Sequence, residues 1–213
     1  MPLQNRVDPF GEIHAVPARG MFTGNRGVIH DPATKTLLKR RWTTRAWILC
    51  ECDFRGRRRE VMGRNSPTGG AGWTELFFLD EATALAAGHR PCFYCRRDRA
   101  TEFARCFAAG QGRETITAPE MDAVLYKERW ASRQGHDRDG GIPGSSLSAL
   151  PAGAMVAANG QAYGKSDAGW LEWSFQRWLP ASEPAADAVL LTPGSTVRAL
   201  TQGYAPVWHP SAG

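Results

Sequence analysis

The chain has 213 residues, of which 42% are apolar, with 26 Lys and Arg against 21 Asp and Glu. This length allows one large domain or two small ones with a real hydrophobic core. The sequence contains no run of about 18 apolar residues, which excludes a helix that spans a membrane. Residues 1–8 also lack the apolar stretch of a signal peptide, so we expect a cytoplasmic protein.

The net charge of +5 is distributed unevenly along the chain. Residues 1–110 carry 18 Lys and Arg against 11 Asp and Glu, whereas residues 111–213 carry 8 against 10. A basic excess confined to one half is typical of proteins that bind a polyanion, although a solvated arginine-rich surface has the same composition. DNA or another nucleic acid is therefore the expected partner, and no membrane partner is expected.

The first strong strand pattern covers residues 47–54, which read Trp-Ile-Leu-Cys-Glu-Cys-Asp-Phe. We expect it to form a hairpin within residues 40–64, with residues 57–62 as the partner strand. Because side chains alternate in a strand, Cys50 and Cys52 would share one face.

A second pattern begins with an expected buried strand over residues 73–79. We expect Asp80 to cap a short helix over residues 81–87 and Gly88 to end that helix. Pro91 prevents the helix from continuing, and a helical pattern returns over residues 96–109.

The remaining elements predict a smaller β-rich unit after a linker. Residues 119–130 have a helical pattern, and residues 131–148 are rich in Gly, Ser and Asp. Beyond them, Asn159-Gly160 is a strong hairpin signal between short strands. We therefore expect an α+β fold, with a basic zinc-stabilised domain over residues 1–130, a linker over 131–148 and a β-rich subdomain over 149–213.

Five cysteines in a cytoplasmic chain favour metal binding, catalysis or burial over a disulfide framework. Cys92 and Cys95 have the Cys-x-x-Cys spacing of a zinc knuckle, which is also the spacing of a thioredoxin-like redox motif. Zinc is favoured because a helix, Gly88 and Pro91 precede the motif, instead of the strand of a βαβ unit. Zinc prefers four ligands, and Cys50 and Cys52 are the natural second pair.

Other residues are candidates for the remaining ligand position of this zinc site. His30 and His89 are the substitutes if Cys50 or Cys52 is not a ligand. The alternative for Cys50 and Cys52 is simple burial, since free cysteine packs well in a core. Cys106 lies between Phe103 and Phe107 on a helical stripe, and we assign it to the core.

Residues 77–97 read Phe-Phe-Leu-Asp-Glu-Ala-Thr-Ala-Leu-Ala-Ala-Gly-His-Arg-Pro-Cys-Phe-Tyr-Cys-Arg-Arg. With its flanking residues, over about 75–98, this segment resembles the metal-binding domain of the Ada family of DNA-repair methyltransferases. That domain also has an aromatic strand, a short Ala-rich helix and an Arg-Pro-Cys-x-x-Cys-Arg turn. The resemblance covers about a tenth of the chain.

The resemblance implies a four-cysteine zinc site beside DNA phosphates, in which an upstream cysteine accepts a methyl group from a phosphotriester. Cys92 and Cys95 match the downstream pair, and Cys50 and Cys52 would stand for the upstream pair. The chain departs from the family there, because the family has Cys-x₃-Cys and this chain has Cys-x-Cys. Zinc binding therefore transfers better than the methyl-acceptor role.

Arginines crowd the cysteines and fit a nucleic-acid partner, because guanidinium groups pair well with phosphate oxygens. The residues assigned to nucleic-acid binding are Arg57, Arg58, Arg59, Arg90, Arg96 and Arg97. Aromatic residues lie among them; Phe93 and Tyr94 are expected to be exposed, and Trp42 and Trp73 to be buried.

Three functions follow from these patterns. The first is a zinc-supported nucleic-acid-binding protein in DNA repair or processing.

The second is a zinc-stabilised enzyme that acts on a nucleic acid or a nucleobase. A deaminase would have the Pro-Cys-x-x-Cys of residues 91–95, but Cys50 is followed directly by Glu51, which is the wrong spacing for its proton shuttle. A nuclease would use a His-Asp pair, and these are His30-Asp31 and His136-Asp137. The third is a non-enzymatic protein that binds a partner through its C-terminal unit.

Overall fold

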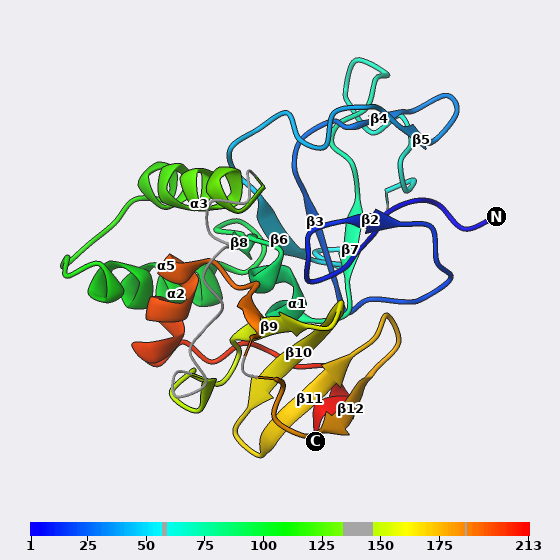
Figure 1. Cartoon of the computed structure of the whole chain (residues 1–213). Coiled ribbons are helices and arrows are strands. Elements are labelled where there is room, and N and C mark those ends of the chain that lie inside the picture. The colour runs from blue at the N-terminus through cyan, green and yellow to red at the C-terminus, as the bar shows by residue number, and fades with distance from the viewer. Residues whose placement is uncertain (57–58, 134–146, 186) are drawn as a thin grey trace.

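The computed structural model describes residues 1–56, 59–133, 147–185 and 187–213 and has the expected α+β fold. Its first sheet is mixed and lies in the N-terminal half (Figure 1). In spatial order its strands are β2 (Ile13–His14), β1 (Arg6–Val7), β7 (Leu76–Phe78), β3 (Phe22–Asn25), β6 (Ile48–Glu51) and β8 (Arg90–Pro91). A two-stranded ribbon of β4 (His30–Asp31) and β5 (Thr36–Leu37) extends from it.

The pairing of β6 differs from the expected hairpin. The strand ends at Glu51 and pairs with β3 on one side and with β8 on the other, and described residues 59–62 form no strand. A local turn is present at Arg55-Gly56, where both residues have positive φ. Long-range partners therefore replace the local one. Because β8 runs parallel to β6, it places the residues after Pro91 beside Cys50.

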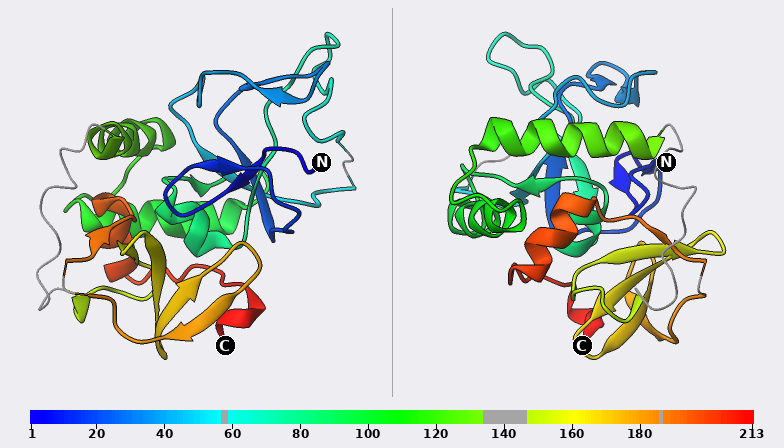
Figure 2. Two further views of the ribbon diagram at one scale, coloured as in Figure 1. Left: turned by 45° about the vertical axis from the view of Figure 1, so that its right-hand side comes forward. Right: turned by 60° about the vertical axis from the view of Figure 1, so that its left-hand side comes forward.

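The α-helices gather on one side of this sheet (Figures 1 and 2); they are α1 (Glu81–Ala86), α2 (Arg97–Gly110), α3 (Ala118–Arg133) and α5 (Gly194–Thr201). The 3₁₀ helix η1 (Pro210–Ala212) lies apart from them, against β12 (Trp178–Ala181). α2 packs against α5, and both enclose an apolar cluster that includes Phe103, Phe107 and Tyr204. Cys106 is fully buried in the same cluster, which confirms its assignment to the core.

The C-terminal unit is a five-stranded antiparallel sheet. Its strands in spatial order are β12 (Trp178–Ala181), β11 (Gly169–Trp173), β10 (Gln161–Ser166), β9 (Met155–Ala158) and β13 (Val189–Leu190). Asn159 and Gly160 both have positive φ and join β9 to β10, which is the expected two-residue hairpin turn. α3 continues to Arg133, three residues past the expected domain boundary, and most of the expected linker lies outside the described residues.

Asp80 and Glu81 are two adjacent, fully buried carboxylates that join the two halves of the chain. Asp80 caps α1 through the Thr83 amide at 2.9 Å and also accepts hydrogen bonds from Trp178 Nε1 at 2.6 Å and the His209 amide at 3.0 Å. The N-cap was expected from the sequence, whereas the bonds to the C-terminal unit were not.

Glu81 is surrounded by donors from both halves. It binds Arg96 Nη1 at 2.8 Å, Arg99 Nη2 at 3.3 Å, the Tyr204 hydroxyl at 2.6 Å and the Val207 amide at 2.8 Å. A buried carboxylate is tolerated only when it is paired in this way. The C-terminal segment is therefore fixed to α1 by ionic and polar contacts as well as by apolar packing.

Glu81→Gln should lower the free energy of unfolding by about 3 kcal/mol, because the buried Arg96 guanidinium would lose its fully buried anion and keep only the more exposed Glu51. The matched control is Glu120→Gln, which removes an ion pair between two exposed side chains, Glu120 and Arg113, and should cost much less. Urea denaturation of both variants measures the difference. Equal losses for the two would contradict the role given to Glu81.

Candidate metal centre

A turn between β8 and α2 carries Cys92 and Cys95. The Cys92 amide donates to the Leu49 carbonyl at 2.9 Å, which extends the β6–β8 pairing into the turn. The Arg96 amide donates to the Cys92 carbonyl at 2.9 Å and closes the turn. The Tyr94 amide also lies 3.3 Å from Cys92 Sγ, so the backbone supplies a hydrogen bond to the sulfur.

Three cysteine sulfurs meet at this turn. Cys50 on β6 and the two cysteines of the turn have Sγ atoms that all lie within 4.8 Å of one another. Among the described residues, they form the only group of three or more His, Cys, Asp or Glu side chains with this spacing. The arrangement can hold a metal ion.

The three sulfurs are coupled by hydrogen bonds. Hydrogen bonds from the Cys50 and Cys95 thiols, helped by backbone amides, lower the pKa of Cys92 to about 2. Hydrogen bonds to Cys92 and Cys95, together with burial, raise the pKa of Cys50 far above its usual range. Metal ions bind thiolates, so binding at such a group releases the thiol protons.

Arg96 fixes the distance between β6 and the turn. Its side chain is 2% exposed, and its Nε donates to Glu51 Oε1 at 2.8 Å while its Nη1 binds Glu81. Glu51 follows Cys50 directly, and its backbone amide hydrogen bonds to the Cys95 sulfur. The residues next to the cysteines thus bring the three sulfurs together.

Cys52, the fourth predicted ligand, does not join this group. β6 ends at Glu51, and Cys52 lies in the following bend with an exposed side chain. The expected alternation of Cys50 and Cys52 on one strand face requires a strand that continues through both residues, and this strand is too short.

The two histidines predicted as substitutes lie elsewhere. His30 is buried and shares a 2.6 Å hydrogen bond with the Thr74 hydroxyl. His89 is fully buried and packs against Phe78, with ring centroids 4.6 Å apart. Neither belongs to the group of sulfurs, and His136 lies outside the described residues.

A groove of about 560 Å³ opens in front of the sulfurs. Cys50, Cys92 and Cys95 lie along one part of it, and Cys52 lines it as well. Aromatic side chains make up much of the remaining wall; they are Phe54, Trp73, Phe77 and Tyr94. Tyr94 is 56% exposed, as expected, whereas Phe93 is half-buried against the core. A metal ion held by the sulfurs would face a space large enough for a small molecule.

The predicted nucleic-acid-binding arginines are divided by the structure. Arg90 is buried and forms a two-pronged ion pair with Asp122, with N–O distances of 2.7 and 2.8 Å, and Arg96 is buried as described above. These two residues position the turn and do not lie on the surface expected for phosphate contacts. Arg59 pairs with Glu75 at 2.8 Å on the groove wall. Arg97 is exposed, and Arg57 and Arg58 lie outside the described residues.

The carboxylate partners of these arginines were missed in the sequence. Glu51 and Glu81 flank the cysteine segments, and Asp122 lies on α3. The sequence does show that a charged residue directly follows a cysteine in two places, Glu51 after Cys50 and Arg96 after Cys95, and this adjacency could have predicted the ion pair.

Comparison of the chain with protein-family models, curated proteins and solved structures yields no match. The resemblance of residues 75–98 to the Ada family therefore remains an expectation from the sequence. Among the described residues, no helix is long and apolar enough to cross a membrane.

His89 gives the fold a specific pH dependence. Burial, and then the neighbouring Arg26 and Arg129, lower the pKa of His89 well below its usual range, and Arg26 Nε lies 3.4 Å from Nε2 of the imidazole. The unfolded chain takes up a proton at this residue below a pH of about 6.5, whereas the folded protein does not, so acid favours unfolding. This contribution to stability is complete above that pH and is lost as the pH falls toward the folded pKa.

The His89→Gln variant should therefore lack about 1.4 kcal/mol per pH unit of the acid destabilisation seen in the wild type. Urea denaturation of both proteins at pH 7 and at pH 5 measures the two slopes. Identical slopes would show that His89 titrates normally in the folded protein.

Proposed function

We propose that the chain is a zinc-binding protein in which Cys50, Cys92 and Cys95 hold the ion. The convergence of the three sulfurs within 4.8 Å carries the proposal. Thiolates bound to zinc at about 2.3 Å in a tetrahedron lie roughly 3.8 Å apart, so one ion fits among these sulfurs. Sulfur donors favour zinc over magnesium and calcium, which take oxygen ligands.

The fourth coordination position faces the groove. Cys52 lines the groove and would complete a closed four-cysteine site if its loop moved inward. Otherwise water or a bound ligand takes the position, as in zinc sites that do chemistry. Single substitutions separate these two arrangements.

The purified protein should contain one zinc per chain, and Cys50→Ser or Cys92→Ser should lower the zinc content severalfold by removing one thiolate. Cys106→Ser is the matched control, because Cys106 is a cysteine buried away from the cluster, and it should retain the metal. Elemental analysis by mass spectrometry gives the stoichiometry.

Retention of full zinc by Cys92→Ser would contradict the site. Cys52→Ser reports on the fourth position: a loss of zinc comparable to that of Cys50→Ser assigns Cys52 as a ligand, and retention assigns the position to a non-protein group.

Nucleic acid is the partner that the composition favours, and DNA repair or processing is the corresponding role. The support lies in the basic excess of residues 1–110, in the arginines that remain near the surface and in the aromatic side chains of the groove. Arginine pairs with phosphates and aromatic rings stack on bases, so the combination fits a nucleic acid.

A gel-shift measurement with single- and double-stranded DNA tests this role. Binding should weaken by at least about tenfold between 50 and 200 mM salt, because phosphate contacts release counterions. A parallel titration with an uncharged polymer of similar size controls for non-specific adsorption. No shift with either form of DNA at low salt would overturn the nucleic-acid role and leave the zinc proposal intact.

A second function, a zinc enzyme acting on a nucleobase, is favoured by one observation. Only three ligand side chains converge among the described residues, and they do so at a groove of about 560 Å³. Catalytic zinc sites keep three protein ligands and an open position. Replacement of zinc by cobalt tests this: added azide should shift the visible spectrum if the position is open, and should leave it unchanged if the site is closed.

A further inference from the structure

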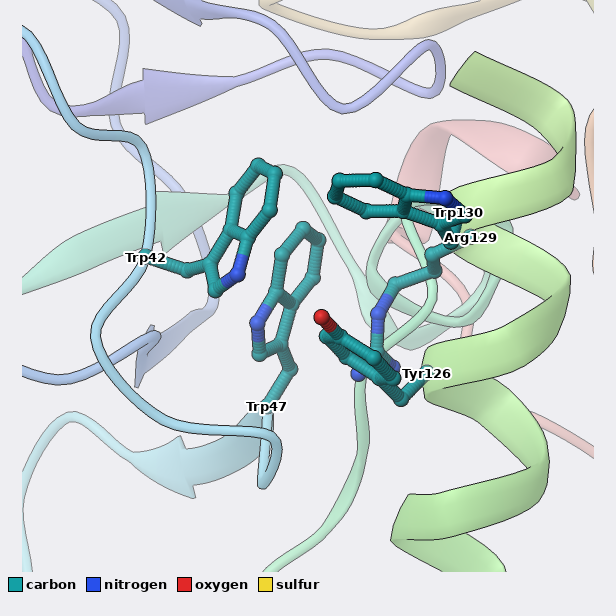
Figure 3. Close-up of a pocket in the computed structure, with 5 residues that line it drawn as sticks. All are labelled: Trp42, Trp47, Tyr126, Arg129 and Trp130. Carbon is teal, nitrogen blue, oxygen red and sulfur yellow. The ribbon is translucent and has the colours of Figure 1, made fainter. Parts of the chain in front are cut away.

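A cluster of aromatic residues forms where the loop of residues 38–47 meets α3. Trp42 and Trp47 come from the loop, and Tyr126, Arg129 and Trp130 come from α3 (Figure 3). The Trp42 and Trp130 rings are perpendicular with centroids 6.3 Å apart, and the Trp42 and Trp47 centroids are 6.0 Å apart. We call these five residues the aromatic surface.

The interior of the aromatic surface is already filled. The cavity among its side chains has a volume of only about 10 Å³. The guanidinium groups of Arg26 and Arg129 lie over the Trp47 ring, 4.0 and 4.2 Å from its centre. A cationic ligand of the kind that aromatic cages bind therefore finds no room inside, because two arginines of the chain hold that position.

Arg129 holds the loop against α3. It donates from Nη1 to the Gly88 carbonyl at 2.8 Å and from Nη2 to the Arg45 carbonyl at 2.7 Å. The second bond ties the loop to α3. Gly88 has positive φ, and a Cβ at that position would meet Arg129 Cδ at 2.7 Å, so the contact requires glycine. The loop that carries Trp42 is thus attached to the helix that carries Trp130.

Among the described residues, part of the aromatic surface is exposed to solvent. Trp130 is 47% exposed, and Trp42 and Tyr126 are half-buried, although Trp42 was expected in the core. Tyr126 and Trp130 are nearly parallel, with centroids 6.3 Å apart. These rings offer flat faces at the surface of the molecule.

The loop that carries Trp42 and Trp47 is basic. The loop of residues 38–47 contains four cations and no acidic residue; they are Lys39, Arg40, Arg41 and Arg45. Lys39, Arg40 and Arg45 are exposed, and the Arg45 guanidinium lies 5.2 Å from the centre of Tyr126.

The acidic residues of α3 do not offset this charge. Glu120 pairs with Arg113 at 2.8 Å, Asp122 pairs with buried Arg90 at 2.7 Å, and Glu128 accepts the Ser195 amide at 2.9 Å. Each is directed to a partner within the protein. Among the described residues of the loop and α3, the exposed charges beside the rings therefore include the cations of the loop and Lys127.

We propose that the aromatic surface binds single-stranded nucleic acid, with bases stacked on Trp130 and Trp42 and phosphates paired with Lys39, Arg40 and Arg45. This inference rests on the proposed nucleic-acid role and names the form of the ligand and the surface that takes it. Aromatic rings beside cations suit a single strand, because its unpaired bases expose faces that stack on the rings while its phosphates pair with the cations. In a duplex those faces are covered by neighbouring base pairs, so only the phosphates are available.

The test measures the Kd of a fluorescent oligodeoxythymidine strand for the zinc-loaded full chain, and the Kd of the same strand in a duplex. Trp130→Ala should weaken single-strand binding by roughly 5- to 100-fold, and Trp130→Phe should restore most of it, because stacking needs only an aromatic face. The combined Lys39→Ala and Arg40→Ala change should flatten the dependence of log Kd on log salt by about one phosphate contact or more.

Tyr163→Ala is the matched control, since Tyr163 is a half-buried aromatic residue on β10 that lines neither the groove nor the aromatic surface, and it should leave single-strand binding unchanged. Tyr94→Ala tests the groove beside the cysteines as the alternative place for the strand, and it should weaken binding less than Trp130→Ala does. A thermal unfolding curve for each variant verifies that it is folded.

Loss of binding in Tyr94→Ala but not in Trp130→Ala would overturn the inference and move the strand to the groove. Binding of duplex as tightly as single strand, with no effect of Trp130→Ala, would also overturn it while the nucleic-acid role stands. Absence of binding to either form would overturn both.

Discussion

Arg96 is the residue on which the arrangement of the site depends. Its buried guanidinium lies between Glu51, which follows Cys50, and Glu81, which begins α1. One side chain therefore sets the separation of β6 from the cysteine turn and connects both to the C-terminal contacts of Glu81. Such a network is stable only while every charge in it has a partner. The three sulfurs are close together because this network of ion pairs holds β6 and the cysteine turn in place.

Much of the segment from β7 to α2 could be predicted, because its signals are local. The strand, the Asp80 cap, the positive φ of Gly88 and the break at Pro91 each depend on residues a few positions apart. The Asn159-Gly160 hairpin was predictable for the same reason. Pairing across the chain was not. β6 takes β3 and β8 as neighbours, whereas the described residues 59–62 of the expected partner form no strand, and its early end at Glu51 separates Cys52 from Cys50.

The buried positions of two arginines show why composition alone does not locate a binding surface. Arg90 precedes the cysteine pair and Arg96 follows it, where phosphate contacts were expected. Both are buried instead, Arg90 in an ion pair with Asp122 and Arg96 in one with Glu81.

The groove of the cysteines and the aromatic surface begin at neighbouring residues. Ile48 lines the groove of the cysteines, whereas the adjacent Trp47 belongs to the aromatic surface. Successive side chains of an extended segment point to opposite sides, so the groove of the cysteines and the aromatic surface can share this stretch of chain without overlap.

X-ray absorption at the zinc edge of the purified protein tests most directly whether Cys50, Cys92 and Cys95 hold a metal ion. We predict at least three sulfur neighbours at about 2.3 Å. A fourth, lighter neighbour at about 2.0 Å would identify an open position occupied by water, and a fourth sulfur would identify Cys52. A shell with fewer than three sulfurs, or protein that takes up no zinc, would contradict the proposed zinc site.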